Sequence, residues 1–415
     1  MLGGMKRKTD RSRPLWPEPV LGGKYVLQLE KLLHSLRPTD AHGNRILHTD
    51  DVLVCYLLAF FNSSIRSLRT VEDFSETQQA QRFLSIDRIP KSTLSDFHRV
   101  ADTDVLKPIV AMLRREVQRR SPHPRSGLSN ILQQVLAVDG SFFSVASDVA
   151  WALKKRSGKS RPSQETSRRA VRLDVHVDIA TWLPEVVSIA DGESEAEHAK
   201  EAIVPGAIHV YDRGIFSFDL VAAHAGKADF VHRLREPGPR TPRFEADEER
   251  PLSDEGRKAG VISDRVGHLV GSAHRAAPSG RYREVIIESP DEPGRQIRLL
   301  TSLLDVPAHI IGLIYRYRWQ VELFFRWLKS CARFRGVWSE TRSGILMQFY
   351  VTLIAMLLMY LRTGLRPSKY ALNLLGMVVA GTACWEEIEP ILARRSRERE
   401  LERARLERKR TEKKI

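Results

Sequence analysis

Cysteine is scarce in this chain, and the cysteines it has lie far apart. The 415 residues include three, Cys55, Cys331 and Cys384, with no Cys-x-x-Cys pair. This spacing argues against a disulfide framework and against a structural zinc site. Low cysteine usage of this kind is typical of a protein of the reducing cytoplasm.

Long apolar runs are also few. The amino-terminal segment is polar and basic, so we expect no signal peptide. One run, residues 344–361, is about the minimum length for crossing a bilayer. Gln348 and Thr352 interrupt it and no second span accompanies it. The run therefore favours a buried helix of a soluble protein over a membrane protein, and we expect no membrane partner.

Acidic residues are fewer than basic residues in this chain. The chain has 66 Lys and Arg against 51 Asp and Glu, a net charge of +15 and a pI near 9.9. A protein this basic usually meets a polyanion, first a nucleic acid and second an acidic membrane surface. Residues 394–415, where Glu and Arg alternate, carry part of the excess. They predict a solvated tail or an exposed helix, either without a specific role or contacting DNA or a second copy.

The length suits two or three domains. Residues 1–25 read as a loose basic arm, and the pattern from about Leu27 to Gln118 is helical. RIPKSTLSDFHRV predicts a turn and then a helix capped by Ser92 or Thr93. We advance a helix-turn-helix role for Lys91 to Arg99 as a hypothesis, with an ordinary helical bundle as the alternative.

The pattern changes after a Pro-rich linker near residues 121–127. It predicts first a strand ending at Asp139 and a mobile basic loop over 154–169. Two strands over 171–189, joined by a tight turn at Ala180 to Trp182, come next. A helix from about 195 and a short strand ending at Asp212, with a helix after it, complete this part. Residues 227–304 follow as a β-rich insertion, with strands near 267–272, 282–289 and 296–304. One long helix is then expected over 307–331.

Two aspartates share a context that points to a site. Asp139 and Asp212 each follow an apolar run and stand directly or nearly so before a glycine, in AVDG and VYDRG. Carboxylates at the ends of neighbouring strands meet at one edge of a sheet, where ligands bind. Each Asp taken alone is also a common turn residue.

The helix expected over 307–331 carries the third element. Tyr315, Arg318, Glu322 and Lys329 follow one another at intervals of 3, 4 and 7 residues. On a continuous α-helix these positions fall within an arc of roughly 60°. An acid beside two cations and a phenol suits phosphate chemistry, although a surface ion-pair network is the simpler reading of Glu between Arg and Lys.

The spacing Tyr-x2-Arg-x3-Glu-x6-Lys resembles the motif of the insertion-sequence-four family of DDE transposases. YRYRWQVELFFRWLK is similar to the family's motif helix, and AVDGSFF and VYDRGIFSFD resemble its two Asp blocks. The resemblance spans roughly residues 130–365, and relatives of this group also carry a β-rich insertion before the motif helix.

The resemblance implies an α/β (α+β) fold with an RNase H-like catalytic core, in which a mixed sheet has flanking helices. It divides the chain into a helical DNA-binding domain with a basic arm (1–125), the first part of the core (126–226), the β-rich insertion (227–304), the last part of the core (305–365), and a helical region with a charged tail (366–415).

The resemblance also implies the chemistry. Asp139, Asp212 and Glu322 would be the catalytic acids and would hold two Mg²⁺ or Mn²⁺ ions, which hard oxygen ligands favour. Tyr315, Arg318 and Lys329 would contact DNA phosphates, and Arg213 is a further DNA-binding candidate. The expected partners are double-stranded transposon ends, target DNA and at least one more copy of the chain. The expected location is the cytoplasm, at the nucleoid.

Two alternatives stay open on the sequence: an RNase H-like nuclease or resolvase that cuts without joining, and an inactive DNA-binding relative. Relatives often cut the second strand through a DNA hairpin by flipping a base onto a Trp. No Trp lies between Trp182 and Trp319, so we assign no hairpin step and name only Phe244 and Tyr282 as aromatic candidates.

Overall fold

The computed structural model divides the chain into two compact units. The helical unit comprises Met1–Pro122 and Trp327–Ile415, and the sheet unit comprises His123–Arg326. The structure describes residues 47–62, 65, 67–81, 87–120, 131, 135–144, 153–155, 168–190, 194–236, 241–271, 276–289, 292, 294–330, 338–364, 366–379 and 381–412. The expected arm and linker, and most of the expected loop at 154–169, fall outside these residues.

The helical unit joins helices from both ends of the chain. Its described elements are α3 (Thr49–Phe61), α4 (Leu68–Ser75), α5 (Gln78–Gln81), α6 (Lys91–Val100), the 3₁₀ helix η2 (Thr103–Leu106), α7 (Lys107–Arg120), α14 (Arg342–Thr363), α15 (Lys369–Val379) and α16 (Trp385–Glu412). Helix α14 packs against α3, α6 and α7, and α15 packs against α3.

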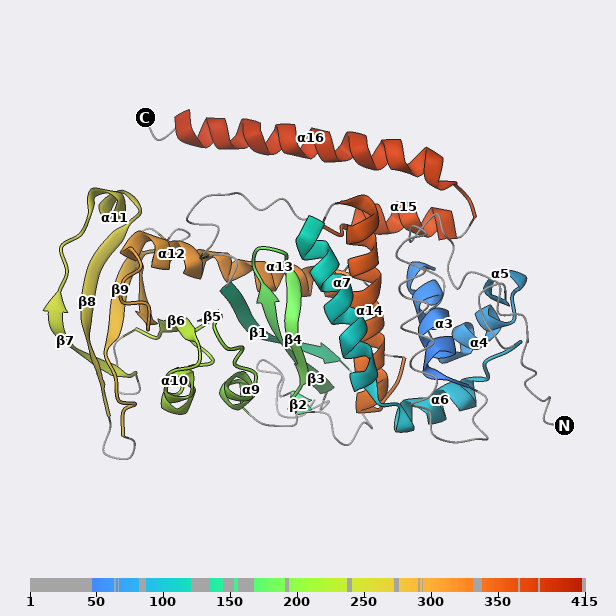
Figure 1. The fold of residues 1–415 in the computed structure, drawn as a ribbon, viewed down its shortest axis with the longest axis horizontal. Helices are drawn as coiled ribbons and strands as arrows, with labels where there is room; N and C mark the ends of the chain where they lie inside the picture. The colour runs from blue at the N-terminus through green and yellow to red at the C-terminus, as the bar shows by residue number, and fades with distance from the viewer. Residues whose placement is uncertain are drawn as a thin grey trace, which may run out of the picture. The chain divides into compact units, whose positions relative to one another are not determined.

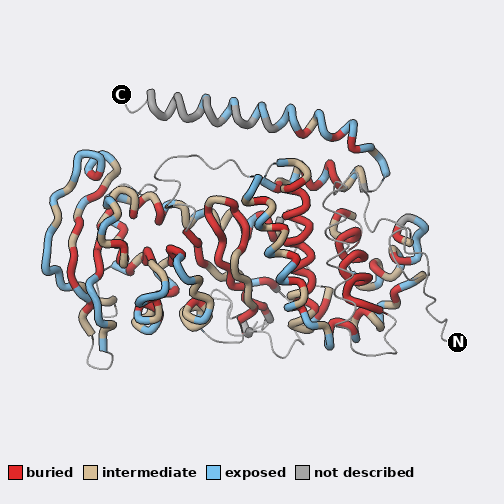
Figure 2. Tube along the Cα trace, viewed as in Figure 1, coloured by how far each residue is buried: buried red, intermediate tan, exposed pale blue. Residues whose placement is uncertain are grey.

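Helix α14 is the buried helix predicted from the apolar run at 344–361. It starts at Thr341, whose side chain accepts a hydrogen bond from the N–H of Gly344, and it ends at Gly364, whose φ of 67° permits a left-handed cap. It is the one helix among the described residues that is long and apolar enough to span a membrane, yet 89% of that apolar window is buried inside the protein. Figure 2 shows this burial along the helix.

Two local expectations in this unit have different outcomes. The predicted helix after the turn is present as α6, but the predicted cap is wrong: Pro90 occupies the N-cap position, without a side-chain hydrogen bond.

At the carboxyl end the charged segment is an exposed helix within α16 as far as Glu412, and most of its described residues face solvent (Figure 2).

The sheet unit is built on one sheet of ten strands. They are β1 (Val135–Ser144), β2 (Leu153–Lys155), β3 (Arg168–Asp178), β4 (Leu183–Ile189), β5 (Ile208–Tyr211), β6 (Asp229–Leu234), β7 (Arg243–Glu249), β8 (Val261–Val270), β9 (Tyr282–Glu288) and β10 (Gln296–Thr301). The order is β2-β3-β1-β5-β6-β10-β9-β8-β7, and β4 also pairs with β3. β1, β5 and β6 run parallel, whereas the other pairings are antiparallel.

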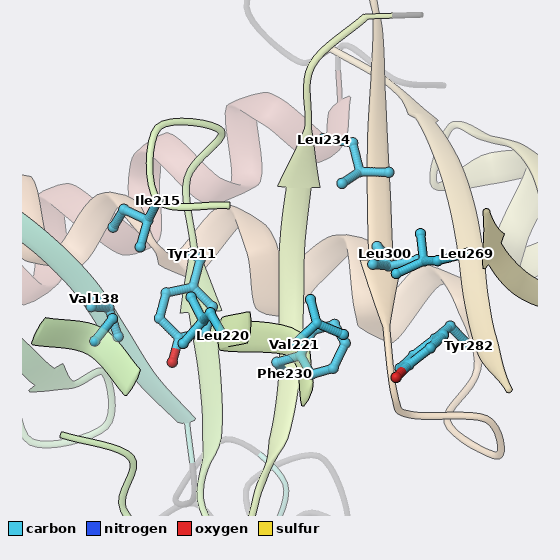
Figure 3. Packing of buried hydrophobic residues seen from close by; sticks show 11 residues of the cluster. Val138, Tyr211, Ile215, Leu220, Val221, Phe230, Leu234, Leu269, Tyr282 and Leu300 are labelled. Atoms are coloured by element: carbon cyan, nitrogen blue, oxygen red, sulfur yellow. The ribbon is translucent and has the colours of Figure 1, made fainter. Parts of the chain in front are cut away.

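Helices cover both faces of this sheet. On one face, α9 (Glu195–Glu201) and α10 (Phe218–His224) contribute Ala199, Leu220 and Val221 to a buried cluster with the strands (Figure 3). On the other face α12 (Ala308–Tyr317) contacts β6, β8 and β9 (Figure 1). A short helix, α11 (Asp254–Lys258), packs on β8 and α12. The mixed sheet with flanking helices confirms the predicted RNase H-like α/β fold.

Three expectations about elements of the sheet unit need correction. Strand β1 does not end at Asp139 but continues to Ser144, because β3 pairs with it as far as Ala170. The strands after β5 are continuous with the central sheet, and they include β7 in the acidic stretch, where we expected no strand. The helix expected over 307–331 is divided at Arg318 into α12 and α13 (Trp319–Ser330).

The division at Arg318 has a local cause. The N–H groups of Arg318 and Val321 donate to carbonyls three residues earlier, at Tyr315 and Arg318. Such i→i+3 bonds tighten the backbone into a 3₁₀-like turn. The four motif residues therefore do not lie on one continuous α-helix.

Candidate active site

The register of two parallel strands brings the two aspartates together. Ala137 on β1 pairs with Val210 on β5. Continued by two residues, this register brings Asp139 beside Asp212, the residue that follows β5, and neighbouring strands are about 4.8 Å apart. Residues two positions apart share a face of the sheet, so both carboxylates belong to the face of Ala137 and Val210. Asp212 follows β5 directly, as predicted.

The position of Asp212 is fixed from both sides. Tyr211 and Ile215 are buried in the core cluster (Figure 3), and the N–H of Ile215 donates to the carbonyl of Asp212, 3.1 Å away. The hydroxyl of Tyr315 donates to Oδ1 of Asp212 (3.2 Å), and Nη1 of Arg233 lies 3.6 Å from the same oxygen. The carboxylate is therefore held by α12 and by the next strand of the sheet.

The position of Glu322 depends on how α13 begins. The indole N–H of Trp182, in the turn between β3 and β4, donates to the carbonyl of Gln320 at 3.0 Å. Trp182 adopts a φ of 64°, which is rare for a large side chain, and it is buried with its ring against Phe324. The tight turn that the sequence predicts here thus anchors the first turn of α13.

Arg318 is the cation that the three acids share. Its Nη2 donates to Oε1 of Glu322 at 2.6 Å. Its positive charge also favours the ionised forms of Asp139 and Asp212, and so opposes the effect of burial on the pKa of each. The structure therefore brings the three predicted acids to one place, around a guanidinium group that is itself largely buried.

The two aspartates nevertheless differ in protonation. Burial raises the pKa of Asp139 to about 7. Arg318 and the Gly140 N–H lower this pKa, but only in part, and the charges of Glu195 and Glu322 raise it further. Burial acts on Asp212 in the same direction, but Arg318, the Arg213 N–H, Arg233 and Tyr315 outweigh it, so its pKa lies below the usual value. Neighbouring acids with separated pKa values are typical of catalytic sites.

The other predicted site residues have mixed positions. Tyr315 is buried, with its hydroxyl on Asp212 and Arg233. Arg213 is exposed beside Asp212. Lys329 lies in the last turn of α13 and belongs to the helical unit. Tyr282, an aromatic candidate for base stacking, is instead buried in the core cluster (Figure 3). Phe244 is partly buried against the same cluster.

Two charged residues at this site went unnoticed in the sequence. Arg233 lies within β6, where an arginine among apolar residues resembles any strand cation. Glu195 opens α9 on the opposite face of β1, against Gly140, and its charge adds to the effect of burial in raising the pKa of Asp139. A small pocket there is lined by Val138, Asp139, Gly140, Asp174, His176, Ser188, Glu195, His198, Ala199 and Ile215. An acidic first turn is so common in helices that Glu195 carried no distinct signal.

The chemistry of the donors can be weighed against a divalent cation. All three predicted ligands offer carboxylate oxygens, which Mg²⁺ and Mn²⁺ prefer. Within the described ranges no three His, Cys, Asp or Glu side chains are close enough to hold a metal ion together. The acids fit such an ion by type and by their shared location, and they would have to draw closer to bind it.

Comparison with known proteins identifies the family. The family described as "Transposase DDE domain" matches residues 131–358, more than half of the chain. A protein of Sinorhizobium fredii named as transposase y4zB is 28% identical over 229 residues, covering 54% of this chain and 62% of that protein. This chain thus spans less than two thirds of that relative.

Two further relatives bear names of insertion-sequence transposases. The one for element IS5377 of Geobacillus stearothermophilus is 35% identical over 79 residues, 19% of this chain and 20% of that protein. The one for element IS4SA of Synechocystis is 21% identical over 309 residues, 71% of this chain and 79% of that protein.

The solved piggyBac transposase synaptic complex with hairpin DNA overlays on 87% of this chain and 78% of that chain, with a TM-score of 0.39 and 11% identity. That level of similarity does not by itself establish a shared fold. The family match extends over both Asp blocks and the motif helix. The chain therefore belongs to the DDE transposases, and its relatives place it with those of the insertion-sequence-four kind.

Proposed function

We propose that this transposase binds the terminal inverted repeats of its own element, cleaves the DNA at those ends and joins the freed 3′ ends to target DNA. The observation that carries the proposal is the meeting of three acids at the end of β1 and β5. The register of Ala137 with Val210 supports the pairing of Asp139 with Asp212, and the bond from Arg318 supports the place of Glu322.

In this proposal Asp139, Asp212 and Glu322 hold two divalent cations, Mg²⁺ or Mn²⁺. When bound, such ions activate a water or a 3′-hydroxyl and stabilise the leaving oxygen in an in-line displacement at phosphorus. The chain's own residues prepare this site. Tyr315 and Arg233 hold the carboxylate of Asp212 in place, and Arg318 keeps compensating charge beside the acids until ligands arrive.

In this proposal, contacts to DNA come from the cations of the motif and from Arg213. Arg318 suits bidentate phosphate contact and Lys329 acts as a point charge, whereas the exposed Arg213 reaches the backbone next to the cut. Tyr315 contributes its hydroxyl at the same place. In the helical unit, Lys91 and Arg99 are exposed on α6, and Leu94 and Phe97 are buried beneath them. This face supports end-specific binding by the amino-terminal helices.

Cleavage of two ends in one event requires at least two copies of the chain in the working complex. We expect this complex to form on double-stranded DNA in the cytoplasm, at the nucleoid. The net charge of +15 favours association with DNA through its phosphates.

The proposal is tested with a labelled fragment that carries the element's own terminal repeats. Purified full-length protein is incubated with it in Mg²⁺ or in EDTA, beside Asp212→Ala. We expect Mg²⁺-dependent breaks at the element end and joined products, both lost in the variant. Breaks without joined products would favour a nuclease or resolvase, and end-specific binding without breaks would favour an inactive relative. Cleavage by Asp212→Ala at the wild-type rate would refute the site.

A separate experiment addresses the face on α6. The double variant Lys91→Ala with Arg99→Ala should bind the terminal repeats less tightly than wild type in a mobility-shift assay, while both proteins unfold at the same temperature. Equal affinity would remove the helix-turn-helix role.

A further inference from the structure

Helix α13 needs an anchor of its own, because it does not continue α12. The backbone tightens at Arg318, where the N–H groups of Arg318 and Val321 donate to carbonyls three residues earlier. The packing of α12 on the sheet therefore does not fix how far α13 is rotated about its axis. That rotation decides where the carboxylate of Glu322, in the first turn of α13, points.

Two ring contacts fix this rotation. Phe325 packs against Phe143, which lies on β1 and on the same face as Asp139, with ring centroids 6.5 Å apart. Phe324 packs edge-on against Trp182, with ring centroids 5.9 Å apart. Neighbouring residues of an α-helix point in directions about 100° apart, so the two contacts hold α13 from two sides.

Trp182 also fixes the position of α13 along its axis. Its indole N–H donates to the carbonyl of Gln320 at 3.0 Å. Gln320 and Phe324 are four residues apart, so one side chain contacts two successive turns of the helix. Glu322 lies between them in the sequence, which directs its side chain to the other side of the helix. Trp182 therefore acts on Glu322 through the helix backbone.

The backbone of Trp182 is held in a conformation that costs free energy. Its φ of 64° lies in the left-handed region that favours glycine, and among the described residues it is the one non-glycine residue with a positive φ. A turn that only joined β3 to β4 would be better served by glycine at this position. Residues held in this region cluster at functional sites, so the strain indicates that the indole itself is needed.

The turn before Trp182 is built to hold it. The carboxylate of Asp178 accepts from the N–H of Ala180 at 2.8 Å and from the hydroxyl of Thr181 at 2.8 Å. The backbone carbonyl of Asp178 accepts from the N–H of Trp182 at 2.7 Å. Asp178 and Thr181 are both buried. Strained backbone persists where its surroundings fix it in this way, so the turn is a rigid support for the indole.

We propose that Trp182 is a positioning residue of the active site, which sets the place of Glu322 relative to the two aspartates by holding the first turn of α13. The inference rests on the proposed function, because it takes Glu322 as a catalytic acid. It gives the turn between β3 and β4 a part in cleavage that goes beyond joining two strands.

The test compares Trp182→Phe with wild type in the full-length protein. The phenyl ring keeps an aromatic contact with Phe324 but cannot donate to Gln320. We expect cleavage of the bound terminal-repeat fragment to slow about 10- to 100-fold, because a small displacement of a catalytic group has effects of this size. Affinity for the fragment should equal that of wild type in a mobility-shift assay. Cleavage of the bound fragment at the wild-type rate would overturn the proposal.

A control variant separates positioning from loss of stability. Thr301→Val also removes a buried donor to a backbone carbonyl, the bond of 2.6 Å to Phe230, in the same unit but on β10. At a temperature well below unfolding it should cut the bound fragment at the wild-type rate. If Thr301→Val slowed cleavage as much as Trp182→Phe does, the effect of Trp182 would be one of stability and the proposal would fail.

Amide hydrogen exchange measures the anchor without DNA and in EDTA. In Trp182→Phe the amides of residues 319–326 should exchange roughly 2- to 10-fold faster than in wild type, the change in local opening that loss of one hydrogen bond produces. Equal exchange would overturn the proposal. Should Trp182→Phe fail to fold, Phe324→Leu loosens the same contact from the side of the helix, and wild-type exchange and cleavage in that variant would overturn it.

Failure of the proposed function is distinguishable from failure of this inference. A wild-type protein that never cleaves its element ends, with faster exchange over residues 319–326 in Trp182→Phe, would refute the transposition chemistry and leave the anchor standing. Cleavage at equal rates by wild type and Trp182→Phe would leave the proposed function standing and overturn the role of Trp182.

Discussion

Two groups of buried charges in the sheet unit differ in balance. In the antiparallel strands, Arg283 grips Asp264 through two bonds of 2.7 and 2.6 Å. Glu284, fully buried, receives two bonds from Arg298 at 2.9 and 2.6 Å and pairs with Arg265 as well. At the end of β1 and β5, by contrast, the part of the chain that the structure describes has three acids, Asp139, Asp212 and Glu322, around two guanidinium groups, those of Arg233 and Arg318.

The difference separates a structural network from a binding site. Asp264 and Glu284 each have a cation within the fold, so this network is complete without a ligand. At the active site, Arg233 and Arg318 pair with Asp212 and Glu322, and burial instead favours the protonated form of Asp139. An imbalance of buried charge thus marks the place where the fold alone is incomplete.

The largest effect is expected in the balanced network. Glu284→Ala leaves the half-buried Arg265 and Arg298 without their buried acid, which should lower the free energy of unfolding by about 3–5 kcal/mol. Urea unfolding followed by circular dichroism measures it. Glu288→Ala is the control, since Glu288 is exposed at the end of the same strand. A loss no larger than that of the control would show that the network is not structural.

Replacement of Asp139 should raise the free energy of unfolding, in contrast to replacement of Glu284. Its pKa in the folded chain is about 7, above the usual value, so the folded state holds the proton more tightly and loses stability as the pH rises through 7. Asp139→Asn avoids this loss. In EDTA at pH 8 the variant should be more stable than wild type by on the order of 2–4 kcal/mol.

The advantage of Asp139→Asn should shrink as the pH falls and vanish near pH 4, where Asp139 is protonated in both states. Buried histidines such as His176 and His209 contribute equally to both proteins and cancel in the difference. A variant less stable than wild type at pH 8 in EDTA would contradict the assigned charge surplus.

A smaller effect follows from the space beside Asp139. In Gly140→Ala the new Cβ would lie 2.4 Å from Oδ1 of Asp174, which Arg172 holds in place. The overlap should destabilise the fold by about 1–3 kcal/mol. Gly214→Ala, where the nearest atom is 4.0 Å away, serves as the comparison in thermal unfolding. Equal effects of the two changes would mean that Asp174 and Glu195 can move aside.

The smallest effect is expected at Tyr315. Tyr315→Phe removes the hydroxyl that donates to Asp212 and accepts from Arg233, which should lower the free energy of unfolding by roughly 0.5–1.5 kcal/mol. Chemical denaturation without DNA measures it. If stability is unchanged while affinity for DNA falls, Tyr315 acts on phosphates alone.

The sequence predicts the part of the site that lies on strand ends. Asp212 follows the all-buried strand IHVY, and a short apolar run of this kind predicts a buried strand. It misplaces the end of β1, because Gly140 and Ser141 read as a turn although β3 continues to pair with them. Pairing across the sheet overrides that local signal.

Other features depend on contacts that no local pattern contains. The apolar periodicity of residues 307–331 is continuous, so nothing in it predicts the turn at Arg318, where Arg318 bonds to Glu322 and acts on both aspartates. Glu195 and Glu197 look alike as acids in a first helical turn. Tertiary packing places Glu195 against Gly140 and Gly214 and leaves Glu197 half-buried beside Lys200.

The most direct test of the charge surplus is unfolding with and without a divalent cation. Wild-type protein in Mg²⁺ at about 100 times its dissociation constant should gain about 2.7 kcal/mol of stability over EDTA. Asp139→Asn should gain far less, and Glu288→Ala should gain as much as wild type. A wild-type unfolding curve that is the same in Mg²⁺, in Mn²⁺ and in EDTA would contradict a cation site between Asp139 and Asp212.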